Sequence, residues 1–138
     1  MSVAIIAVLL DAATALFSMI TAAKTAQSAL NDPERKQQVA DIFAQIADTL
    51  TEAVEKLRQN EIPHGACQSL AHYGQVLPSI LSGVINDGAA HFYGTQLVQA
   101  HNVESLIIAV RDGGADQLVE LEKAAGIFRA ASYTVVLE

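Results

Sequence analysis

Residues 32–58 read DPERKQQVADIFAQIADTLTEAVEKLR and carry the clearest structural pattern in the chain. Asp32 suits the N-cap of a helix, and Pro33 suits the first helical position, where its missing N–H has no partner to lose. This spacing predicts an amphipathic helix over residues 33–60, with one buried and one charged face. Apolar residues recur at steps of three and four: Val39, Ile42, Phe43, Ile46, Leu50, Val54 and Leu57. The charged residues of the other face are Glu34, Asp41, Asp48, Glu52, Glu55, Lys56 and Arg58.

Helical patterns also flank this segment on both sides. An apolar first helix is predicted over residues 2–30, because Asn31-Asp32-Pro33 is a strong stop signal. Further helices are predicted over residues 64–131, where Pro78 should kink or split the helix that starts near His64, with a short helix continuing to Ile85. The last helix is expected to end at Ala131, which leaves residues 132–138 as a tail.

The composition of the 138-residue, 14.6 kDa chain fits one helical domain. Hydrophobic residues make up 51% and charged residues 17%, a balance that argues against intrinsic disorder. Aromatic residues reach only 5% and tryptophan is absent, so the core must be aliphatic and rich in alanine. We therefore predict an all-α fold, a single helical bundle of four or more helices with a long apolar N-terminal helix.

The charge balance excludes some partners. Fifteen Asp and Glu residues against eight Lys and Arg give a net charge of −7 and a pI near 4.9. A nucleic-acid binder needs a basic patch to neutralise phosphates, so no nucleic-acid partner is expected. Steady attraction to an anionic membrane is disfavoured for the same reason. The single cysteine, Cys67, cannot form an internal disulfide and suits a reducing compartment.

Residues 3–23 form an apolar run of 21 residues whose only charge is Asp11. No Lys or Arg precedes Lys24, so the run lacks the basic start of a secretory signal. At 1.5 Å per residue its length roughly matches the ~30 Å hydrocarbon core of a bilayer. The apolar residues of this candidate membrane-active helix are Val3, Ile5, Ile6, Val8, Leu9, Leu10, Leu16, Phe17 and Ile20.

The polar residues of this helix gather on one side. At 100° per residue they fall within about 80° of one another. The apolar residues together favour membrane insertion by about 3 to 5 kcal/mol, whereas Asp11 opposes it by about 2.5 to 3.5 kcal/mol. The net free energy of membrane insertion is therefore close to zero. The helix is either the buried core of a bundle or a segment that enters lipid once its protein packing is removed. The polar stripe comprises Asp11, Thr14, Ser18, Thr21 and Thr25.

An apolar helix close to the initiator Met, followed by an acidic amphipathic helix and more helices, resembles the HeLo-like cell-death domains of fungi and, more closely, the bacterial Bell domains. The segment Ile62-Pro63-His64-Gly65-Ala66-Cys67, continuing to Leu70, Tyr73, Leu77 and Pro78, adds to this likeness. The resemblance implies an effector domain that permeabilises membranes when a signalling partner oligomerises it, with its N-terminal helix as the membrane-active element. Asp11 departs from the expected apolar run.

The sequence gives weaker support for a metal site, a catalytic cysteine or a phosphate-binding loop. His64, Cys67, His72, His91 and His101 lack the tight pairing typical of zinc sites. Cys67 lies on the apolar stripe of its helix, where a free cysteine behaves as a small hydrophobe rather than a nucleophile. No phosphate-binding glycine loop is present. We therefore expect no enzyme activity, no cofactor and no metal.

The sequence thus predicts a membrane-permeabilising cell-death or defence effector that acts through its N-terminal helix after oligomerisation. Its expected partners are membrane lipids when activated, further copies of itself and an upstream signalling protein. Its expected location is the cytoplasm when inactive and the cell membrane when activated. The alternative is a non-enzymatic helical module for protein–protein interaction or signalling, with the first helix permanently buried. A metal- or haem-binding bundle is a third possibility.

Overall fold

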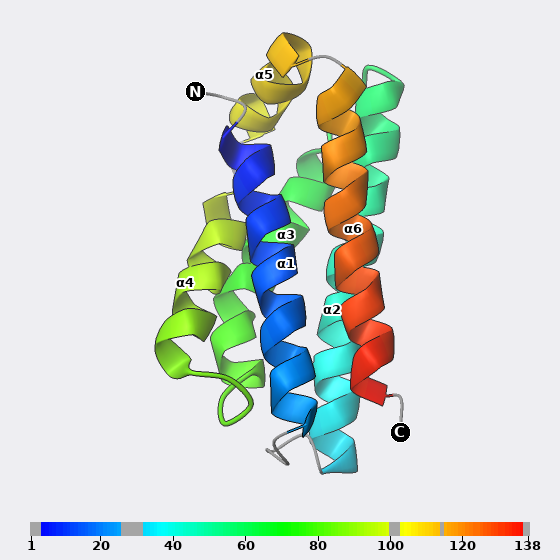
Figure 1. Cartoon of the computed structure of the whole chain (residues 1–138). Helices are drawn as coiled ribbons and strands as arrows, with labels where there is room; N and C mark the ends of the chain where they lie inside the picture. The colour runs from blue at the N-terminus through cyan, green and yellow to red at the C-terminus, as the bar shows by residue number, and fades with distance from the viewer. Residues whose placement is uncertain (1–3, 26–31, 100–102, 114, 137–138) are drawn as a thin grey trace.

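The computed structural model describes residues 4–25, 32–99, 103–113 and 115–136 (Figure 1). Within these ranges the chain forms six α helices, which confirms the predicted all-α bundle with an apolar N-terminal helix. The helices are α1 (Ala4–Thr25), α2 (Pro33–Arg58), α3 (His64–Ile80), α4 (Asp87–Val98), α5 (Val103–Gly113) and α6 (Ala115–Val136).

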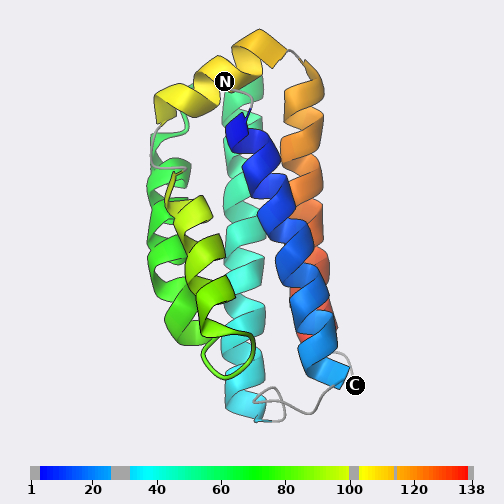
Figure 2. The ribbon, with the colours of Figure 1, turned by 60° about the vertical axis from the view of Figure 1, so that its left-hand side comes forward.

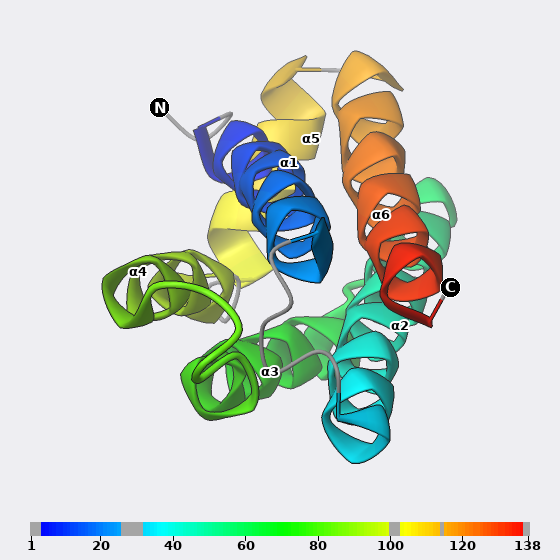
Figure 3. The same cartoon turned by 60° about the horizontal axis from the view of Figure 1, so that its bottom comes forward.

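Five of these helices form a ring in the order α1, α6, α2, α3, α4, with α4 closing back onto α1. Figure 3 shows this ring from one end of the bundle. The contact between α1 and α4 is the least extensive of the five. The remaining helix, α5, lies across one end and contacts α1 and α6 (Figure 2). The apolar N-terminal helix is therefore one wall of the bundle, with a broad contact on α6 and a narrow one on α4.

The charged helix α2 forms as its sequence predicts. The Asp32 carboxylate accepts a hydrogen bond from the backbone N–H of Glu34 at 3.1 Å, and Pro33 occupies the first helical position. Of the seven predicted apolar residues only Leu57 is not fully buried, and the acidic residues of the opposite face are exposed. The helix ends at Arg58, two residues before the predicted end, and Asn60 then turns the chain with a φ of 59°.

Two further predicted boundaries are wrong. Pro78 lies inside α3, which continues to Ile80 and is followed by turns rather than by a short helix reaching residue 85. Pro78 has no N–H to donate to the carbonyl oxygen of Gly74, four residues earlier, and the helix ends two residues after it. Residues 132–136 belong to α6 and not to a tail, since Val135 is fully buried and anchors the last turn in the core. The predicted positions 2–3 and 26–30 of the first helix lie outside the described residues.

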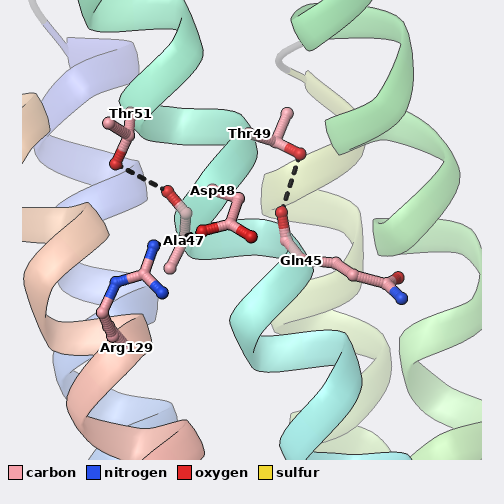
Figure 4. Close-up of polar contacts among 6 residues, drawn as sticks. All are labelled: Gln45, Ala47, Asp48, Thr49, Thr51 and Arg129. Atoms are coloured by element: carbon pink, nitrogen blue, oxygen red, sulfur yellow. Dashed lines mark hydrogen bonds and ion pairs between the residues drawn. The ribbon is translucent and has the colours of Figure 1, made fainter.

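The contact between α2 and α6 is the most extensive in the bundle. The ring centroids of Phe43 and Phe128 lie 6.0 Å apart across this contact, and both side chains are fully buried. At its edge, Arg129 of α6 forms an ion pair with Asp48 of α2 (Figure 4). An exposed pair of this kind contributes at most about 1 kcal/mol, so apolar burial holds the two helices together. Of these two helices, α6 makes the broad contact with α1.

The helices α3 and α4 approach each other backbone to backbone. A Cβ atom added to Gly74 would lie 2.4 Å from the carbonyl oxygen of Gly94, and one added to Gly94 would lie 2.5 Å from that of Gly74. Both positions therefore require glycine for steric reasons. This crossing makes α3 and α4 a tightly packed pair, beside which α1 completes the ring.

Candidate membrane-active helix

The part of the chain that the structure describes contains one helix long and apolar enough to cross a membrane, by length and composition. It spans Ile5–Lys24, 20 residues near the N-terminus, within α1. The core helix of a bundle passes the same test, so the placement of its side chains decides how the segment is interpreted.

The apolar residues of α1 face the core along a stripe centred on Leu9, Leu16 and Ile20, none of which has measurable exposure. Alanines complete this buried face and allow close packing: Ala12, Ala13 and Ala23. Of the predicted membrane-active residues, Ile6, Leu9, Leu16 and Ile20 are buried, whereas Ile5, Val8, Leu10 and Phe17 are half-buried along the flanks. Val3 lies outside the described residues.

The predicted polar stripe faces away from the core. Asp11, Thr14, Ser18 and Thr21 are all exposed, as are Ala7 and Ala22 beside them. The side chain of Thr25 lies outside the part described. The arrangement places the one acidic residue of α1 in water, where its charge carries no desolvation cost. Among the described side chains of α1, the exposed ones are therefore polar or small, and the large apolar ones are buried or half-buried.

Two hydroxyl groups of this stripe donate hydrogen bonds to carbonyl oxygens of α1 itself. Thr14 donates to the carbonyl oxygen of Leu10 at 3.0 Å, and Thr21 donates to that of Phe17 at 2.9 Å. Because donor and acceptor belong to the same helix, this hydrogen bond persists when the helix moves from water or protein into lipid. These two threonines therefore add little to the cost of moving α1 into lipid, and Asp11 is the main polar obstacle within the apolar run.

Lys24, the cation at the C-terminal end of α1, is not among the functional residues predicted from the sequence. The Lys24 ammonium is half-buried and donates to the backbone carbonyl oxygen of Thr134, 2.6 Å away in the last turn of α6. The pairing joins residues 110 positions apart. The one signal in the sequence is its position as the first cation after a long apolar run.

Burial holds α1 against the bundle more strongly than any polar contact. Burying one large aliphatic side chain stabilises by about 1.5 to 3 kcal/mol, so its four fully buried ones supply about 6 to 12 kcal/mol. A bilayer offers those side chains an equally apolar environment. The free-energy cost of moving α1 from the bundle into a bilayer thus has two sources. One is the burial of Asp11 in lipid, and the other is the core surface that α1 leaves exposed on the remaining helices.

The remaining candidate residues do not gather into a reactive group. Cys67 is fully buried, and burial raises the pKa of its thiol to about 11, which keeps it protonated at neutral pH. The side chains of His64, His72 and His91 are exposed, and His101 lies outside the described ranges. The described residues contain no group of three or more His, Cys, Asp or Glu side chains that could hold a metal ion.

Comparison of the chain with models of protein families, with curated proteins and with solved structures finds no match. The likeness to the HeLo-like and Bell domains therefore stays a prediction. The functional interpretation depends on α1 itself: a helix of membrane length, set in the wall of a closed bundle, with its only acidic residue in water.

Proposed function

We propose that this chain is a membrane-permeabilising effector domain of the cell-death or defence type, held closed until it oligomerises. In the closed state the apolar face of α1 covers the core. In the active state α1 leaves the wall of the bundle and enters a bilayer, where its polar stripe faces neighbouring copies or a water-filled lumen. Membrane lipids, further copies of the chain and an upstream signalling protein are the partners in this proposal.

The observation that carries the proposal is the division of α1 between two environments. Its apolar face is long enough to cross a membrane and is buried equally well in a protein core or in hydrocarbon. Its exposed stripe contains a single charge, Asp11. Its position in the ring supports the same mechanism, because α1 can move outward past its narrow contact with α4. In this proposal the cost of uncovering the core keeps the isolated bundle closed, and oligomerisation supplies the free energy that opens it.

The test adds a charge where the closed bundle tolerates it and a membrane does not. Thr14 lies near the middle of the membrane-length segment and is exposed, so Thr14→Asp should leave the closed fold intact. A second mid-helix carboxylate costs about 2.5 to 3.5 kcal/mol on insertion. Carboxylates on adjacent copies also repel one another if the stripes meet. We expect dye release from vesicles by the oligomerised protein to fall by at least about tenfold.

Thr95→Asp in α4 is the matched control. Thr95 is also exposed, and its hydroxyl also donates to the carbonyl oxygen four residues earlier, that of His91, at 2.9 Å. This variant should retain wild-type release. Both proteins are oligomerised by a coiled coil fused after Glu138 and are checked for folding by thermal unfolding. Equal release from the two folded variants, or no release from the oligomerised wild type, contradicts the proposal.

A helical interaction module is the second candidate, favoured by the complete burial of Leu9, Leu16 and Ile20. In that case α1 is a permanent structural element and a partner binds another face. This alternative predicts that Thr14→Asp and Thr95→Asp behave alike and that no vesicle releases dye. The same experiment therefore distinguishes the two candidates.

A further inference from the structure

Two cations bind helix C-termini at one end of the bundle. Lys24 of α1 donates to the carbonyl oxygen of Thr134, two residues before the end of α6. Arg35 of α2 donates to the carbonyl oxygens of Ser79 and Ile80, at 3.3 and 2.7 Å, where α3 ends. The last carbonyls of a helix have no intrahelical donor and carry the negative end of its dipole, so each cation joins one helix to the end of another.

The two joints differ in what they connect. Arg35 joins α2 to α3, which belong to the part of the bundle that stays together in the proposed mechanism. Lys24 joins the proposed mobile helix to α6, the helix on which α1 chiefly rests. Because α1 and α6 run parallel and end side by side, this bond holds the C-terminal end of α1 against the C-terminal end of α6 (Figure 1).

We propose that the bond from Lys24 to the Thr134 carbonyl is an autoinhibitory latch that holds α1 on α6. This inference rests on the proposed function. Opening the latch frees the C-terminal end of α1, after which the helix can separate from α6 turn by turn. The latch is reversible and needs no covalent step.

The chemistry of lysine suits both states of such a latch. In the closed bundle the ammonium neutralises the dipole ends of α1 and α6 together. Lys24 also ends the membrane-length segment, where a long cationic side chain reaches out to the phosphates of lipid headgroups. On activation the ammonium exchanges a peptide carbonyl for a lipid phosphate and does not have to enter hydrocarbon. A cation within the apolar run would instead oppose insertion.

The test compares Lys24→Met with Lys123→Met in the full chain. Each variant removes one positive charge, so both carry the same net charge. Lys123 lies in α6, and its one ion pair among the described residues is an exposed one with Glu120 at 3.3 Å, which contributes little. Hydrogen–deuterium exchange is measured without vesicles, and dye release is measured from phosphatidylcholine vesicles with the coiled-coil-oligomerised protein.

Lys24→Met should speed amide exchange in α1 by about tenfold, the equivalent of about 1.4 kcal/mol, while exchange in α3 stays unchanged. It should also lower the protein concentration needed for half-maximal dye release, whereas Lys123→Met should change neither quantity. Unchanged α1 exchange in Lys24→Met overturns the latch, as does an equal rise in α1 and α3, which would indicate general destabilisation. If α1 exchange rises selectively but no oligomerised protein releases dye, the latch stands and the proposed function fails.

Discussion

At the scale of single residues, burial determines chemistry more than residue type does. Cys67 could have been a nucleophile by its identity, yet it lies among apolar side chains without exposure. Burial raises the pKa of its thiol because the thiolate loses its hydration. The sequence predicted this environment correctly, since Cys67 and Leu70 share the apolar stripe of one helix.

The raised pKa of Cys67 predicts an alkaline loss of stability. Between pH 9 and about 11 the unfolded chain releases the thiol proton while the folded chain keeps it. The free energy of unfolding should therefore fall as pH rises through this window, by at most about 1.4 kcal/mol per pH unit from this group. Below pH 9 the thiol is protonated in both states and contributes no slope.

Urea unfolding of the wild type and of Cys67→Ala at several pH values from 8 to 11 measures this effect. Other groups titrate in the same range in both proteins, so the difference between the two curves isolates the thiol. The free energy of unfolding of the wild type should decline more steeply than that of Cys67→Ala. Parallel curves would show that the folded protein does not hold this proton.

At the scale of helices, the crossing of α3 and α4 shows what periodicity leaves out. Gly74 and Gly94 each sit inside a helical pattern, where glycine normally weakens the helix. Their contact explains both residues, but it joins positions twenty apart and depends on how the two helices cross. The sequence predicts that these helices exist, whereas the register of one against the other is a tertiary property.

Gly74→Ala should destabilise the bundle. Its Cβ would lie 2.4 Å from the Gly94 carbonyl oxygen and 2.9 Å from the Cβ of Leu97, distances that force the backbones apart. Overpacking of this kind costs about 1 to 3 kcal/mol. The control is Gly126→Ala in α6, where an added Cβ meets nothing within 4 Å. There the better helix propensity of alanine should stabilise by about 0.5 to 1 kcal/mol.

Urea unfolding of the two glycine variants provides the measurement. The expected result is opposite shifts in the unfolding midpoint, downward for Gly74→Ala and upward for Gly126→Ala. Downward shifts of similar size in both variants would mean that helix propensity and local packing do not explain the two sites. In that case the close crossing of α3 and α4 would lose its support.

At the scale of the whole molecule, the sequence predicts the class of fold and the two faces of α1. Periodic apolar residues gave α2 its buried face, and the clustered hydroxyls together with Asp11 gave α1 its exposed one. The ring order, the position of α1 in its wall and the bond from Lys24 to Thr134 depend on contacts between distant segments. No local pattern encodes those contacts, so they emerge only in the folded chain.

The proposed function requires α1 to exchange its protein contacts for lipid, whereas it does not require α3 or α4 to enter the membrane. Met19 and Gln96 are half-buried residues of α1 and α4, respectively, and each can be replaced by cysteine to carry an environment-sensitive fluorophore. The buried, protonated Cys67 should react slowly and leave the label on the introduced cysteine. The two labelled proteins form a matched pair.

The decisive measurement is quenching of these labels by lipids that carry a quencher in the acyl chain, in vesicles mixed with the coiled-coil-oligomerised protein. We expect a blue shift and strong quenching for the label at position 19 and neither change for the label at position 96. If the oligomerised protein binds vesicles but the label at position 19 keeps the emission spectrum that it has in water and is not quenched, α1 does not enter the bilayer and the proposed function is wrong.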